Sequence, residues 1–67
     1  MEGIDMMKQA TDYWFGQSHR HWHLKARDEN GTVYHVRTLW RESEDVRLAE
    51  HRLVSMMKKK HGLITAY

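Results

Sequence analysis

The sequence has no cysteine and no long apolar run, and each absence narrows what the chain can be. Without cysteine, disulfides and thiolate zinc sites are excluded. No stretch approaches the roughly 20 apolar residues of a membrane span. The acids within the first five residues do not fit a secretory signal, which needs bases there. We therefore expect a cytoplasmic protein without a membrane partner.

The chain is also short. Its 67 residues predict one small domain over residues 1–67. A domain of this size buries only about 60% of its unfolded surface. Disulfides, a metal or oligomerisation commonly supplement so small a core. Since disulfides are excluded, a homodimer or another folding partner is a reasonable expectation.

Sequence signals of catalysis and of cofactor binding are missing as well. There is no cysteine nucleophile and no glycine-rich phosphate loop. Ser18 and His19 are adjacent, but neighbours on a strand point to opposite faces and form no triad. A chain this short leaves little room for a pocket. We predict no enzymatic activity, no catalytic residue and no cofactor.

The formal net charge is only +2, but the charge is unevenly distributed. Residues 1–18 carry one base and three acids, whereas residues 19–41 carry five bases, two acids and four of the six histidines. Residues 42–67 are nearly balanced. The middle of the chain is therefore the electropositive part, and this asymmetry is more informative than the total charge.

A first helix is predicted over about residues 4–15. Its apolar positions recur every three or four residues and are followed by a glycine that can take the left-handed conformation: Ile4, Met7, Thr11, Trp14 and then Gly16. The aromatic run Tyr13–Phe15 leaves open that a strand begins there instead. The periodicity favours the helix.

Two alternating stretches, 19–27 and 32–41, flank the turn sequence Asp28–Gly31 and predict a β-hairpin. A two-residue turn would mix the two faces of this hairpin. A three-residue loop instead pairs Asp28 with Thr32 and sorts them. The apolar face then carries Trp22, Leu24, Ala26, Tyr34, Val36, Thr38 and Trp40, and we expect this face to join Trp14 in the core.

A second helix is predicted over about residues 44–61, with Ser43 as its N-cap and Gly62 after its last residue. Its apolar stripe consists of Val46, Ala49, Leu53, Met56 and Met57. Residues 63–67 are β-prone and form either a third strand or a tail. The predicted fold is α+β, in the order α-β-β-α, with both helices covering one face of the antiparallel hairpin.

The other face of the hairpin, which we call the open face, is predicted to be strongly basic. In the three-residue-loop register it carries no acid and consists of His19, His21, His23, Lys25, Arg27, Val33, His35, Arg37, Leu39 and Arg41. A solvated face normally mixes charges of both signs. A single sign of charge indicates a binding surface, although a polar sheet face can also be merely solvated.

The alternating histidines raise the question of a metal site. His21 and His23 would point the same way, and His35 lies across from them on the neighbouring strand. However, Lys25 and Arg37 would flank such a site, and their fixed charges repel a dication. No carboxylate is near to orient an imidazole. We predict no metal site.

The open face has the chemistry of a nucleic-acid interface. A two-stranded ribbon fits the major groove of duplex DNA, its cations neutralise phosphates, and its histidines stack on bases or donate to phosphates. The strand–turn–strand–helix order over residues 21–54 is similar to that of integrase arm-type DNA-binding domains, which read DNA with a sheet. The likeness covers about half of the chain and includes no diagnostic residue. We predict a small, non-enzymatic DNA-binding accessory or regulatory protein.

The residues predicted to bind are His21, His23, Lys25, Arg27, His35, Arg37, Leu39 and Arg41, with Lys58, Lys59 and Lys60 as secondary contacts. The negative end of the helix dipole is the favoured explanation of the three lysines, and phosphate contacts are the secondary one. The alternative function is a phage- or plasmid-type adaptor or inhibitor that docks the same face on an acidic surface of a larger protein. Val33 and Leu39 would then supply its apolar anchor.

Overall fold

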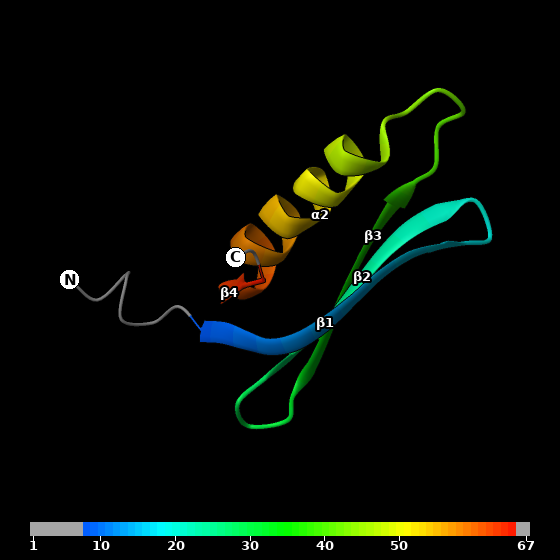
Figure 1. Ribbon diagram of the computed structural model, residues 1–67. Helices are drawn as coiled ribbons and strands as arrows, with labels where there is room; N and C mark the ends of the chain where they lie inside the picture. Colours follow the sequence, from blue (N-terminus) through cyan, green and yellow to red (C-terminus); the bar gives the residue numbers. More distant parts are fainter. Residues whose placement is uncertain (1–7, 66–67) are drawn as a thin grey trace.

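The computed structural model describes residues 8–65 and shows a strand-rich α+β fold (Figure 1). Its elements are β1 (Lys8–Ser18), β2 (His21–Asp28), β3 (Val33–Leu39), α2 (Val46–His61) and β4 (Leu63–Ile64). The strands form one mixed sheet in the order β3-β2-β1-β4. The β1–β2 and β2–β3 pairs are antiparallel, whereas β4 lies parallel to the start of β1. The α+β class is as predicted, but residues 8–65 contain one helix where two were expected.

The predicted helix over residues 4–15 is wrong wherever the structure describes that segment, because Lys8–Ser18 form a strand. Residues 4–7 lie outside the described residues. The aromatic run Tyr13–Phe15 has high strand propensity. In addition, pairing with β2 gives hydrogen-bond partners to backbone groups that an isolated hairpin would leave at an open edge. These two effects outweigh the helical spacing of the apolar residues.

The predicted register of the β2–β3 hairpin is confirmed. Leu24 pairs with Val36 and Ala26 pairs with Tyr34, as the three-residue loop requires. Because residues that pair across antiparallel strands share a face, this register places the apolar side chains of both strands on the same side. A shift by one residue would have moved one strand's whole apolar set to the opposite face.

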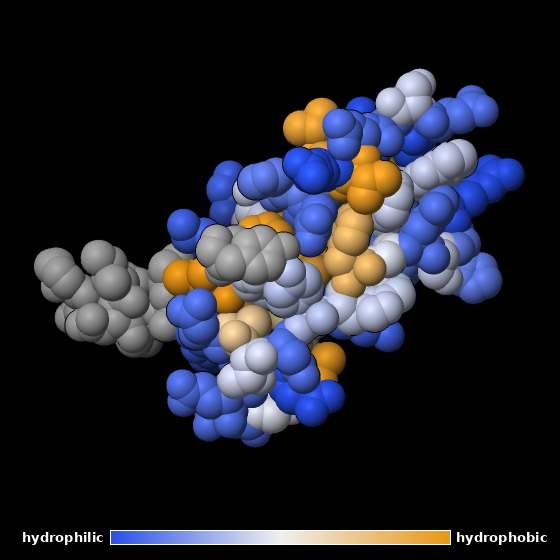
Figure 2. Space-filling view, in the orientation of Figure 1, coloured by the Kyte–Doolittle hydropathy of each residue, from blue (hydrophilic) through white to orange (hydrophobic). Residues whose placement is uncertain are grey.

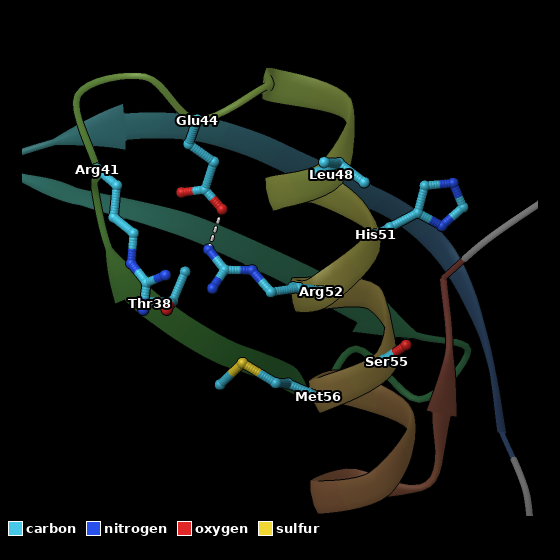
Figure 3. A pocket seen from close by; sticks show the side chains of 8 residues that line it. All are labelled: Thr38, Arg41, Glu44, Leu48, His51, Arg52, Ser55 and Met56. Carbon is cyan, nitrogen blue, oxygen red and sulfur yellow. Dashed lines mark hydrogen bonds and ion pairs between the residues drawn. The ribbon is translucent and has the colours of Figure 1, made fainter.

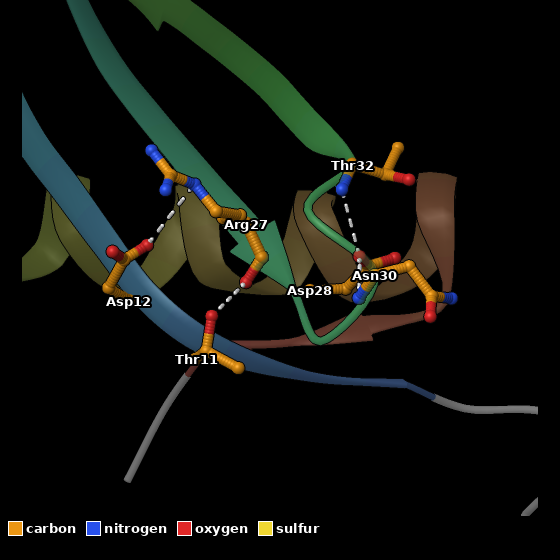
Figure 4. A network of polar contacts seen from close by, with 6 residues as sticks. All are labelled: Thr11, Asp12, Arg27, Asp28, Asn30 and Thr32. Carbon is orange, nitrogen blue, oxygen red and sulfur yellow. Dashed lines mark hydrogen bonds and ion pairs between the residues drawn. The ribbon is translucent and has the colours of Figure 1, made fainter.

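The β2–β3 turn is held by a buried carboxylate. One oxygen of Asp28 accepts from the backbone N–H groups of Asn30 and Thr32 at 2.9 and 3.0 Å, as Figure 4 shows, and the other accepts from the Tyr34 hydroxyl at 2.9 Å. Burial raises the pKa of Asp28, but the hydrogen bonds from Thr32, Tyr34 and Asn30 outweigh it and hold that pKa below its usual value. Gly31 has the expected left-handed φ of 85°.

The core lies between α2 and one face of the sheet (Figure 1). The sheet contributes Trp22, Leu24, Ala26 and Val36, and the chain from the helix onward contributes Ala49, Leu53, Met57 and Leu63. The ring of Phe15, from β1, stacks on Trp22 with 5.3 Å between centroids. Figure 2 shows that apolar colour gathers in a broken band over α2 and the sheet beside it, with hydrophilic side chains on both flanks.

The helix α2 follows the prediction more closely at its end than at its start. Gly62 follows its last residue with φ 66°, and its backbone N–H donates to the carbonyl of Lys58, so the predicted C-terminus is confirmed. The N-cap is Asp45, not Ser43: the Asp45 carboxylate accepts from the Arg47 N–H at 2.8 Å. Val46 consequently sits at the first helical position and is 52% exposed, outside the core.

The prediction that three tryptophans belong to the core holds for one of them. Trp22 is buried, whereas Trp14 is 50% and Trp40 is 39% exposed. In a strand, side-chain direction alternates, and Trp14 pairs with Lys25 on the face away from α2. Trp40 directly follows the last residue of β3, so it lies outside the paired strand.

Two further features complete the fold. His19 and Arg20 connect β1 to β2 in a two-residue turn, and both have left-handed φ angles, 52° and 68°.

The chain beyond α2 returns to the sheet. Leu63 and Ile64 join the sheet as β4, next to Lys8 and Gln9 of β1, so of the two alternatives for residues 63–67 the strand holds for these two. Within residues 8–65, no helix is long and apolar enough to cross a membrane.

Candidate functional site

The open face is the side of β1, β2 and β3 turned away from α2. Because Trp22, Leu24 and Ala26 point toward the helix, the residues between them point outward together with their cross-strand partners. β1 adds a third row to the two rows predicted. The face therefore consists of Asp12, Trp14, Gly16 and Ser18 on β1, His21, His23, Lys25 and Arg27 on β2, and Val33, His35, Arg37 and Leu39 on β3.

Seven of the eight primary predicted residues lie on this face: His21, His23, Lys25, Arg27, His35, Arg37 and Leu39. Lys25 has a central position, between Trp14 of β1 and His35 of β3. Arg37 pairs with His23. The structure therefore brings the predicted binding residues together, apart from one arginine. His19, which the sequence also placed on the face, lies in the β1–β2 turn.

Arg41 is the predicted residue that the structure removes from the open face. The alternation ends with β3 at Leu39, and the chain then turns toward α2, with the Glu44 N–H donating to the Arg41 carbonyl at 3.1 Å. Arg41 lines an open groove of about 520 Å³ between β3 and α2, where Glu44 and Arg52 form an ion pair (Figure 3). The prediction that Arg41 lies on the open face is wrong because the strand ends at Leu39.

The open face contains an acid that the two-stranded prediction lacked. Asp12, on β1, pairs with Arg27, and its carboxylate lies 3.9 Å from the Arg27 Nε (Figure 4). Both side chains are more than half exposed, so water screens this ion pair strongly. The prediction of a face without acids is therefore wrong. Lys25 and Arg37 keep the remainder of the face positive.

The histidines form a directional hydrogen-bonded chain. His23 Nε2 lies 3.1 Å from the Ser18 carbonyl, which can only accept, so neutral His23 carries its proton on Nε2. Its Nδ1 then accepts from His35 Nε2 at 2.9 Å. His21 Nδ1 donates to the His19 carbonyl at 3.0 Å. The rings of His23 and His35 are nearly parallel, with centroids 5.1 Å apart.

The surroundings of His35 keep it uncharged at neutral pH. Partial burial is the largest cause that lowers its pKa, and electrostatic repulsion from His23, Lys25 and Arg37 lowers it further. Neutral His35 donates from Nε2 to His23 Nδ1, so a proton taken up by His35 goes to its Nδ1 and leaves that hydrogen bond in place.

Metal binding finds no geometric support among residues 8–65. No group of three His, Cys, Asp or Glu side chains in this part of the chain is arranged to hold an ion. Both ring nitrogens of His23 already have hydrogen-bond partners, and His35 Nε2 faces His23.

Trp14 is the site residue that the sequence prediction missed. An ideal Cβ on Gly16 would lie 2.5 Å from Trp14 Cζ2, so the indole rests over Gly16 on its own strand. The Lys25 ammonium lies over the ring, 5.8 Å from its centroid. A signal was present in the sequence: a glycine two residues after a tryptophan faces the same way on a strand and leaves space for the ring.

Lys58, Lys59 and Lys60 are exposed in the last turn of α2, on the helix side of the sheet. They lie on a different side of the molecule from the open face, so the structure does not join them to the main site. Comparison with protein families, with curated proteins and with solved structures finds no match for this chain.

Proposed function

We propose that this protein binds nucleic acid through the open face and has no enzymatic activity. The observation that carries the proposal is the cluster of cations and histidines on the adjacent strands β2 and β3, with Lys25 at its centre. Duplex DNA is the target expected from the sequence, and the cytoplasm is the expected location. The accessory or regulatory role expected of a phage or mobile-element protein belongs to the same proposal.

The geometry suits contact with a phosphate backbone. Cations two residues apart on one strand, such as Lys25 and Arg27, are about 7 Å apart, and cross-strand neighbours are about 5 Å apart. Such spacing allows several phosphates to be neutralised by one rigid surface, with release of condensed counterions. His35 adds charge when an anion stabilises its protonated form. Binding is therefore expected to be strongly dependent on salt.

The test is a salt-titrated binding measurement with duplex DNA, single-stranded DNA and RNA of equal length. A protein that makes several phosphate contacts loses affinity by orders of magnitude between about 50 and 200 mM salt. We expect this loss, with a linear relation between the logarithms of affinity and salt concentration. Absence of binding to all three polymers at the lowest salt concentration would contradict the proposal.

The alternative function is that of an adaptor or inhibitor that docks on an acidic surface of another protein. A homodimer of this chain is compatible with either function. Exposed apolar side chains on the open face favour the alternative function: Val33 is 59% exposed and pairs with Arg27, and Leu39 is 62% exposed and follows Arg37 by two residues. Apolar anchors surrounded by charged groups are typical of protein interfaces. If nucleic acids do not bind, this alternative becomes the leading proposal.

A further inference from the structure

Trp14 presents a half-exposed indole at the β1 side of the open face. The ring rests over Gly16, where an ideal Cβ would lie 2.5 Å from Cζ2 and 2.8 Å from Cη2. Only a glycine leaves that space, so the ring packs against the strand backbone and keeps its outer side accessible. An aromatic side chain has only two rotatable bonds, and packing of this kind lowers the conformational entropy that it loses when a partner stacks on it.

A shallow hollow lies next to this ring. It has a volume of about 280 Å³ and is lined by Trp14, Asp12, Lys25, Arg27 and Val33, together with Tyr13 and Ala26. This volume is just below the roughly 300 Å³ of the smallest pockets for drug-sized ligands. The hollow therefore suits one planar ring system. Its charged residues are suited to contacts with a base edge and with a phosphate.

We propose that Trp14 stacks on an unpaired base seated in this hollow, so that the protein prefers single-stranded to duplex nucleic acid. The inference rests on the proposed function and changes its expected target. In a duplex, neighbouring pairs cover the base faces, and a base reaches an aromatic side chain only after unstacking. A single strand offers its base faces without that cost.

Lys25 completes the proposed subsite. Its ammonium lies 5.8 Å from the centroid of the Trp14 ring. When a base covers the ring, the flexible lysine stem allows the ammonium to move to the adjoining phosphate. Charge alone favours duplex DNA, which has the higher density of phosphates. A measured preference for single strands would therefore indicate that a base stacks on Trp14.

The experiment compares a short oligothymidine with a duplex of equal length, at one salt concentration, for the full chain and three variants. Trp14→Ala removes the ring, Trp14→Phe keeps a smaller ring, and Trp40→Phe is the control away from the open face. We expect Trp14→Ala to weaken oligothymidine binding by about fivefold to a hundredfold, the usual effect of one lost stacking contact. Trp14→Phe should lose less, and Trp40→Phe should match the parent.

Gly16→Ala is a second test of the stacking inference, because the added Cβ displaces the Trp14 indole without removing it. We expect weaker oligothymidine binding and unchanged duplex binding. Equal affinity of Trp14→Ala and the parent for oligothymidine, with duplex binding retained, would overturn the stacking inference and leave the proposed function intact. If the parent binds neither polymer, the proposed function itself fails. Circular dichroism of each variant checks that the fold is retained.

Discussion

The two faces of β2 differ in almost everything except their backbone. Trp22, Leu24 and Ala26 are between 0 and 7% exposed and pack against α2. The residues that alternate with them on β2, His21, His23, Lys25 and Arg27, carry imidazole, ammonium and guanidinium groups on the open face. Both sets share one strand and one hydrogen-bonding pattern. Strand alternation therefore places the residues of the core and those of the proposed binding surface one position apart along the chain.

This separation depends on elements outside β2. The helix buries the apolar face by covering it, and β1 widens the open face with Trp14 and Asp12. Neither face would have its present character in an isolated hairpin, which is only marginally stable in water. Substitutions on the two sides should therefore produce different kinds of effect, and the following predictions test that division.

The largest expected effect is on stability, from truncation of a leucine on the helix side. Leu24→Ala leaves a cavity at a fully buried position, and we expect a loss of about 2–5 kcal/mol in the free energy of unfolding. Leu39→Ala, on the open face at 62% exposure, should change it by about 0.5 kcal/mol or less. Urea unfolding of both variants measures the comparison, and equal losses would show that the faces are not distinct.

The next effect is on binding, from reversal of a charge on the open face. Arg37→Glu should lower nucleic-acid affinity at least about tenfold, since a phosphate contact becomes a repulsion, with little change in stability. Arg47→Glu makes the same change of net charge at an exposed position of α2 and serves as the control. If both variants lose affinity equally, then binding follows net charge and not the open face. Loss of the fold in Arg37→Glu would show that the face assignment is reversed.

A smaller effect, on the free energy of unfolding, is expected from substitutions in the two-residue turn between β1 and β2. His19 and Arg20 both have left-handed φ angles, which Asn and Gly adopt at lower cost. The double variant His19→Asn with Arg20→Gly should raise the free energy of unfolding by about 1 kcal/mol. Thermal or urea unfolding measures the gain. A decrease would show that the native side chains stabilise the turn more than its backbone strain destabilises it.

The smallest effect is the pH dependence of binding through His35. Its pKa lies below the usual value of about 6.5, so it is neutral at pH 7 and gains charge only as the pH falls below that value. Affinity should rise there by about two- to fivefold, the range of one exposed ion pair. His35→Gln should reduce this rise. A parent profile that is flat down to pH 5 would remove His35 from the mechanism.

The same pKa predicts a change in stability with the opposite sign. The unfolded chain takes up the His35 proton at higher pH than the folded chain does. Protonation therefore favours unfolding as the pH falls from the unfolded pKa toward the folded one. Without nucleic acid the parent should lose some stability in that window, and His35→Gln should lose less. As the pH falls through this window, the open face is therefore expected to bind nucleic acid more tightly while the free protein becomes less stable.

Local sequence predicted the β2–β3 hairpin well because the signals act over short distances. Alternation identified Trp22, Leu24 and Val36 as buried, and the turn chemistry around Gly31 fixed the register. Most of the open face followed from that register. The sequence also located the end of α2, because a glycine in the left-handed conformation terminates a helix whatever surrounds it.

The errors arose where distant contacts decide the outcome. The segment before the hairpin has apolar residues at helical spacing, yet it pairs with β2 as a strand, and this places Trp14 on the open face. Arg41 leaves that face because the chain turns to begin the helix. Helix and strand propensities differ by only about 1 kcal/mol per residue, so pairing with a neighbouring strand can override them.

The alternation of β2 and β3, their register, and the cations and histidines on the outer side of both strands can be derived from the amino-acid sequence, because they depend on the two-residue period of a strand and on the turn residues. Long-range pairing makes β1 a third strand, leaves α2 as the one helix over the core side within residues 8–65, and brings Trp14 and Asp12 next to the basic residues. These features escape the sequence because a backbone edge can pair with any suitable strand, and the choice depends on the total area buried and the hydrogen bonds satisfied.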